Sequence, residues 1–126
     1  MVKRIEITEA MLKEQKLVLH TQDFLVDEKE LQARGQMLVD SNSLAFIYIL
    51  ENNDEFVYVS LPHTIWPSLN EARISNCEIA LLVNEKELIL VDLLTELSYL
   101  LENIQGNANY GEQMEEKVVE LFQLDK

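Results

Sequence analysis

The hydrophobic period changes from two to 3.6 near residue 90, and this change constrains the fold more than any other feature. Before it, apolar and polar residues alternate in short runs, which indicates β-strands. After it, apolar residues recur at three- and four-residue spacings from Leu90 to Ile104 and again from Met114 to Phe122, as in amphipathic helices. A chain with strands first and helices last is expected to form an α+β domain.

Three strand pairs are expected before the change. Residues 3–11 and 16–22 alternate and are joined by the polar "KEQK". Residues 44–51 and 55–61 are β-branched and aromatic, and they flank the turn-forming "NND", the clearest hairpin signal in the chain. A third pair, "CEIALLV" and "ELILV", is joined by "NEK". Together these pairs predict an antiparallel sheet of about five to seven strands.

Two further strand features refine this expectation. Between the first two pairs, Phe24 and Val26 suggest a short strand and Gly35 a bend. In "LAFIYIL" both alternating sets of residues are apolar, so this strand should be covered on both faces and belong in the centre of the sheet.

A short middle helix is expected in "PHTIWPSLNEARIS". Thr64 is a candidate N-cap with Pro67 inside the first turn, and "SLNE" at 68–71 matches a capping box one turn later. The two helices after residue 90 are expected to form a C-terminal αα-hairpin, and the middle helix and the hairpin should pack on one face of the sheet.

The stretch "NIQGNANYGEQ", residues 103–113, joins these last two helices. Gly106 lies where a left-handed residue ends a helix, and Asn109 with Glu112 matches an N-cap with its reciprocal carboxylate. Gly111 would be the second residue of the last helix, where glycine weakens the helix and usually has another purpose, such as allowing close approach by another backbone. The residues that these capping roles leave unexplained are Asn107, Tyr110 and Gly111.

Length and charge exclude several classes of function. The 126 residues match a single domain spanning 1–126. Ten Lys and Arg against 23 Asp and Glu give a net charge of -13, so the surface repels phosphate backbones and anionic lipid headgroups. Neither nucleic acid nor a membrane is therefore expected as a partner. The negative charge is densest in the last third of the chain, where a basic protein partner would bind.

The cysteine and glycine content of the chain excludes further kinds of site. Cys77 is the single cysteine, so neither an intramolecular disulfide nor a cysteine-based metal site can form, and a reducing cytoplasm is the simplest compartment. No secretory signal and no run of about 18 apolar residues is found. Three glycines cannot build a nucleotide-binding glycine loop. No cofactor and no metal are expected.

No catalytic constellation emerges from the sequence. His63 precedes a helix and lies near an indole in the sequence, but a capping or packing role is favoured over catalysis. A hydrolytic triad of Ser41 or Ser60 with His63 and Asp40 lacks the G-x-S-x-G turn that exposes a serine nucleophile. The sequence therefore predicts no catalytic residues.

Four stretches carry a resemblance to a known family. These are "GQMLVDS", "LAFIYILE", "FVYVSLPHTIW" and "NIQGNANYGE". In their order and spacing the chain resembles uncharacterised protein family 0738, small acidic proteins of Bacillus and its relatives with no assigned activity. The resemblance implies a cytoplasmic protein of a Gram-positive bacterium and offers no catalytic residues to carry over. It also favours proximity in space of "PHTIW" and the asparagine-rich stretch.

Two hypotheses of function follow. The first is a non-catalytic protein-interaction or regulatory domain, whose acidic surface and sheet edges bind a protein partner or a second copy of the chain. The second is a small-molecule-binding protein or hydrolase with a pocket near His63, Trp66 and Tyr110. The residues expected to contact a ligand or partner are His63, Thr64, Trp66, Asn107, Asn109, Tyr110 and Gly111.

Overall fold

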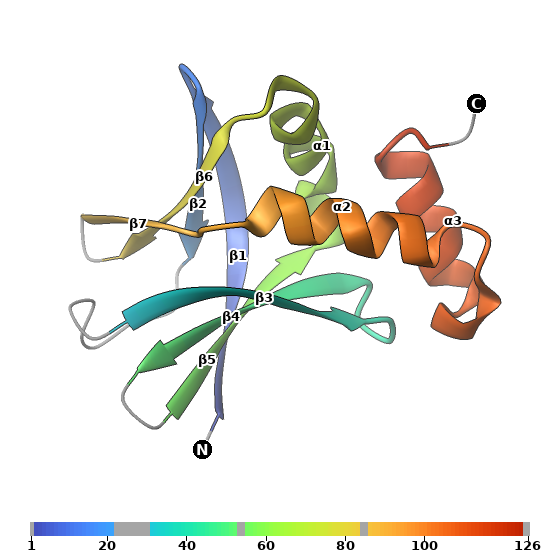
Figure 1. Cartoon of the computed structure of the whole chain (residues 1–126), viewed down its shortest axis with the longest axis horizontal. Helices are drawn as coiled ribbons and strands as arrows, with labels where there is room; N and C mark the ends of the chain where they lie inside the picture. The colour runs from blue at the N-terminus through green and yellow to red at the C-terminus, as the bar shows by residue number, and fades with distance from the viewer. Residues whose placement is uncertain (1, 22–30, 53–54, 84–85, 125–126) are drawn as a thin grey trace.

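The structure, a computed structural model, describes residues 2–21, 31–52, 55–83 and 86–124 (Figure 1). Its strands are β1 (Val2–Lys13), β2 (Lys16–Thr21), β3 (Leu31–Asp40), β4 (Ala45–Asn52), β5 (Glu55–Pro62), β6 (Glu78–Val83) and β7 (Lys86–Ile89). Its α-helices are α1 (Trp66–Ser75), α2 (Leu93–Ile104) and α3 (Glu112–Leu121). Two short 3₁₀ turns, η2 (His63–Ile65) and η3 (Ala108–Tyr110), precede α1 and α3. The α+β class is confirmed.

The three expected hairpins are all present. Strand β1 pairs antiparallel with β2, β4 with β5, and β6 with β7. Both faces of β4 are buried from Ala45 to Leu50, as its doubly apolar sequence predicts. Gly35 lies inside β3 at a bulge, with φ 70°, instead of in a bend between elements. The short strand suggested by Phe24 and Val26 lies outside the described residues.

The sheet is mixed, so the expectation of a purely antiparallel sheet is wrong. The strand order is β3-β4-β5-β1-β2-β6-β7, in which the N-terminal hairpin lies between the other two groups of strands. Strand β1 runs parallel to β5, and β2 runs parallel to β6. A hairpin in the middle of a sheet pairs with another strand on each side, here β5 and β6. Whether those strands run parallel or antiparallel to the hairpin depends on the connections elsewhere in the chain.

Helix α1 carries the chain from β5 to β6 and contacts β1 and β2 on its way. Its N-cap is Ile65, because η2 runs directly into the helix and the Trp66 N–H bonds to the His63 carbonyl. The prediction of Thr64 as N-cap and the alternative capping box at 68–71 are therefore wrong. Pro67 lies in the first turn as expected, where its missing N–H costs no helical hydrogen bond.

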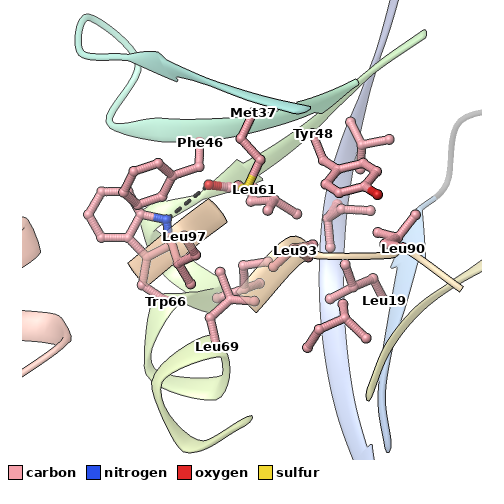
Figure 2. Packing of buried hydrophobic residues seen from close by; sticks show 14 of the residues in the cluster. Leu19, Met37, Phe46, Tyr48, Leu61, Trp66, Leu69, Leu90, Leu93 and Leu97 are labelled. Atoms are coloured by element: carbon pink, nitrogen blue, oxygen red, sulfur yellow. Dashed lines mark hydrogen bonds between the residues drawn. The ribbon is translucent and has the colours of Figure 1, made fainter. Parts of the chain in front are cut away.

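The sheet is curled, and α2 runs from the end of β7 alongside β3 to α3 (Figure 1). Helix α2 contacts β3, and α3 contacts both α2 and α1. One face of the strands and the apolar sides of all three helices contribute to a single hydrophobic cluster. Figure 2 shows part of this cluster around Trp66, Phe46 and Leu97.

The Tyr48 side chain links the start of α2 to strand β3. Its hydroxyl donates a hydrogen bond to the Val91 carbonyl at 2.6 Å and accepts one from the Gly35 N–H at 3.2 Å. Burial raises the pKa of Tyr48 to about 12, since the charged phenolate is poorly solvated there. The phenol is therefore a neutral donor at physiological pH.

Candidate functional site

The first half of the expected site lies at the start of α1, and its tryptophan is a core residue. Trp66 is 0% exposed. Its ring centroid lies 5.0 Å from that of Phe46 and 5.5 Å from that of Phe122. Its indole N–H donates to the Leu61 carbonyl at 2.9 Å, as Figure 2 shows. Both the apolar ring and the polar N–H of Trp66 are therefore engaged within the protein.

His63 lies next to Trp66, with ring centroids 6.3 Å apart in an edge-on arrangement. Its backbone N–H donates to the Leu44 carbonyl at 3.0 Å, which fastens η2 to the start of β4. Its side-chain Nδ1 is buried and, in the described part of the chain, has no hydrogen-bond partner. The adjacent Thr64 is exposed. The packing role expected for His63 accounts for its ring contact, whereas Nδ1 has no structural explanation.

The second half of the expected site is the connection between α2 and α3. The Asn107 N–H donates to the Ile104 carbonyl, and the Asn107 side chain accepts a hydrogen bond from the Asn109 N–H at 3.0 Å. Tyr110 is half-buried and packs against the core. These contacts give Asn107 and Tyr110 roles in holding the connection, in the manner of an Asx turn.

The N-cap of α3 is Gly111, so the prediction of Asn109 as N-cap is wrong. Gly111 has φ 96°, a backbone conformation that side-chain-bearing residues rarely adopt, while nothing lies within 4 Å of a Cβ placed there. The glycine is required by its backbone angle, and not by close approach of another backbone. Gly106 has φ 75° just after α2, as expected, and its N–H donates to the Glu115 carboxylate at 2.6 Å.

Among the described residues, no hydrogen bond, ion pair or ring contact joins the His63–Trp66 segment to the 107–111 segment. The clefts described below are lined by other residues. A shared pocket near His63, Trp66 and Tyr110 stays a prediction.

Ser60 and Asp40, two residues of the hydrolytic triad considered from the sequence, both bind Arg4 on the outer side of the sheet. The Arg4 guanidinium donates to the Ser60 hydroxyl at 3.1 Å and forms an ion pair with Asp40 at 2.9 Å. Burial acts to raise the pKa of Asp40, but hydrogen bonds from Arg4 and Ser43 outweigh it and leave that pKa lowered. A carboxylate held charged in this way braces the sheet and does not orient His63.

The clefts on the described surface include the following three. One of about 330 Å³ lies where the end of α1, β6 and the start of α2 meet, and Cys77 is among its lining residues. The second, of about 550 Å³, is lined by Glu115, Glu116, Val119 and Glu120 of α3. The third, of about 230 Å³, lies between Leu44 and α3, where it is lined by Gln113, Glu116, Lys117 and Glu120.

Helix α3 contributes residues to two of these clefts. Glu116 and Glu120 are one helical turn apart and line both of its clefts. Lys117 is the cation beside them, and its Nζ lies 3.8 Å from Glu120. The dense negative charge of the last third of the chain indicated this surface in the sequence. The clefts could not be predicted from the sequence.

Neither a metal-holding cluster nor a membrane-spanning helix is found in the described ranges. Over these residues, no group of three or more His, Cys, Asp and Glu side chains is placed to hold a metal ion. None of the described helices is long and apolar enough to cross a membrane.

Fold and surface together define a small mixed α+β protein in which polar side chains such as Arg4 and Tyr48 link separate strands and the start of α2. The chain belongs to the family of unknown function UPF0738, which matches residues 5–122, and the resemblance seen in the sequence is confirmed. Proteins of Bacillus mycoides strain KBAB4 and Bacillus cereus strain G9842 are 41% identical to it over 122 residues, covering 97% of this chain and 99% of theirs.

A relative from Bacillus cytotoxicus is 42% identical over the same length and coverage. All three carry only the name UPF0738 protein, so the relatives are bacterial and their function is unknown. No solved structure matches the chain.

Proposed function

We propose that this chain is a cytoplasmic, non-catalytic interaction domain that binds a protein partner through helix α3. The observation that carries the proposal is the pair of clefts on α3, which share Glu116 and Glu120 and of which the larger also contains Val119. An apolar side chain among carboxylates suits a partner segment with lysines or arginines around one apolar anchor.

The balance of charge on α3 supports a basic partner. Glu112, Glu115, Glu116 and Glu120 lie on this helix with Lys117 as its single cation. Within the described residues, Glu116 has no cation at ion-pair distance, and Glu115 is held by the Gly106 N–H. A cationic side chain from a partner would bind next to Glu116, which unlike Glu120 is held by no described cation of the chain.

The way α3 is held also supports a surface role. The Arg73 guanidinium on α1 donates to the Phe122 carbonyl at 3.1 Å and to the Asn70 side chain at 2.9 Å. Met114, Val118 and Phe122 fix the inner side of α3 in the core. We infer that α2 and α3 act as one αα-hairpin on one face of a single domain, which would present the outer side of α3 as a rigid surface.

Affinity capture from an extract of the bacterium that encodes the chain tests this proposal. The wild-type protein should retain a basic protein at near-physiological salt, and the double variant Glu116→Gln with Glu120→Gln should lose it. Glu9→Gln with Glu71→Gln is the matched control, because both residues are exposed, lie away from the α3 clefts and remove the same charge. Equal capture by the two double variants would show that general acidity, and not α3, retains the protein.

A further inference from the structure

The outer face of strands β3, β4 and β5 carries an apolar strip. On β4, Phe46, Tyr48 and Leu50 face the core, so Ile47 and Ile49 point to the opposite side. The same alternation places Tyr58 and Phe56 of β5 on that outer side. Leu38 of β3 is in register with Ile47, and Ile49 is in register with Tyr58. The outer strip consists of Leu38, Ile47, Ile49, Tyr58 and Phe56.

The two ends of the outer strip are its exposed parts. Leu38 is 44% exposed and Phe56 is 43% exposed, while Ile47 and Ile49 between them are buried. Single exposed apolar residues are ordinary on a protein surface, but here they end one continuous apolar row across three strands. Leu38 and Phe56 are therefore the parts of the row that a second layer can still cover.

Paired charges of both signs bracket the outer strip. At the Phe56 end, Arg34 lies 3.3 Å from Glu51, the residue in register with Phe56. At the other end, Arg4 forms ion pairs with Asp40 and Glu6. Two of the three arginines in the chain therefore lie on this face. Each copy carries a net charge of -13, so most surfaces of two copies repel one another. This face differs because it has both an arginine and a carboxylate at either end of the outer strip.

The edges of the sheet are poorly suited to pairing with another chain. Strand β3 has its bulge at Gly35, whose N–H is already bonded to the Tyr48 hydroxyl. Strand β7 is four residues long and begins with the charged pair Lys86 and Glu87. Bulges, shortness and charge are features that keep edge strands from pairing. Association between copies is therefore expected through a face of the sheet and not through its edges.

We propose that two copies of this chain associate face to face through the outer strip. A two-fold axis that lies in the interface plane places each end of one copy's outer strip against an end of the other copy's strip. Each arginine then lies near a carboxylate of its own copy and a carboxylate of the second copy. Leu38 and Phe56, exposed in one chain, become covered by the second. This association uses the side of the sheet away from its core and does not depend on the α3 clefts.

Sedimentation velocity over a concentration series up to about 100 µM tests the proposal. The wild-type protein should sediment as a dimer at the upper concentrations. The double variant Leu38→Gln with Phe56→Gln should raise the dimer dissociation constant about ten-fold or more, because it truncates the exposed apolar side chains that the second copy would cover. Buried Trp66 fluorescence reports whether each variant is folded, and both single variants are measured in case the double variant is not.

The matched control is Ile74→Gln with Tyr99→Gln, which alters two exposed apolar residues of the helices, at 68% and 62% exposure. This control and Glu116→Gln with Glu120→Gln should both keep the wild-type dissociation constant. A wild-type protein that stays monomeric at the highest concentration, or a dimer that the outer-strip variants leave unchanged, would overturn the proposal. Neither result bears on partner binding by α3.

Discussion

The Tyr48 hydroxyl connects three parts of the chain that are distant in sequence: its own strand, the β3 bulge at Gly35 and the carbonyl of Val91 before α2. Tyr48→Phe should lower the free energy of unfolding by about 1 to 3 kcal/mol, because it leaves a backbone N–H and a backbone carbonyl without their partner. Urea denaturation followed by circular dichroism measures this change.

Tyr99→Phe is the control for this substitution, since Tyr99 is exposed on α2 and loses the same hydroxyl. Its free energy of unfolding should stay within about 0.5 kcal/mol of the wild type. If Tyr48→Phe behaved like Tyr99→Phe, water would be replacing the lost bonds and the hydroxyl would not hold α2 in place.

The same residue makes a prediction about pH. Burial raises the pKa of Tyr48 from 10.0 to about 12, so the folded state keeps its proton over a range in which the unfolded chain loses it. The stabilisation is complete below pH 10 and is lost as the pH rises towards 12. The free energy of unfolding of the wild type should therefore fall towards that of Tyr48→Phe over this interval. A constant difference between the two proteins up to pH 12 would contradict the raised pKa.

Helix caps show the limit of sequence reasoning at this scale. Thr64 and Asn109 have the right side chains and spacing for N-caps, but Ile65 and Gly111 occupy those positions. A cap is defined by backbone angles, and short 3₁₀ turns before both helices move the first helical residue beyond the expected one. Gly106 was predictable because a left-handed residue after a helix has few alternatives.

At the scale of elements, the β3 bulge depends on Gly35. A Cβ there would lie 3.1 Å from the Asp92 carboxylate and 3.2 Å from the Asp92 Cβ, besides requiring φ 70°. Gly106 has a similar φ and open space around it. Gly106→Ala should cost about 1 kcal/mol for the backbone alone, and Gly35→Ala about 1 to 2 kcal/mol more, because Asp92 must move.

Chemical denaturation of both glycine variants measures the difference between them. Equal losses of stability would mean that the contact between β3 and the start of α2 relaxes without cost. A larger loss for Gly35→Ala would show that this contact resists movement and fixes the position of α2 alongside β3.

Hairpins could be predicted from sequence, whereas their order in the sheet could not. Alternation and turn residues are local signals, and they placed β1–β2, β4–β5 and β6–β7 correctly. Pairing of β1 with β5 and of β2 with β6 brings together residues more than fifty positions apart, as with Ile5 and Val59. The buried runs in β2 and β6 were compatible with either direction of pairing, so only the complete fold determines it.

At the scale of the whole molecule, the acidic charge and the apolar surface lie on different elements. Carboxylates concentrate on α3, and the outer strip lies on β3, β4 and β5. The last third of the chain was predictable as the acidic region because charge can be counted. The clefts and the strip required the fold, since they combine residues from separate segments or depend on which side of a strand faces the core.

The single hydrophobic cluster makes a prediction about cooperativity. It includes side chains from the sheet and from all three helices, so the helices should not unfold separately from the strands. Trp66 is the single tryptophan and lies between Phe46 and Phe122, where its fluorescence reports contact between α1, β4 and the end of α3. Urea titrations followed by Trp66 fluorescence and by far-ultraviolet circular dichroism should give the same midpoint, as expected for one domain. Separated midpoints would show that the helices form a unit that dissociates from the sheet before the strands unfold.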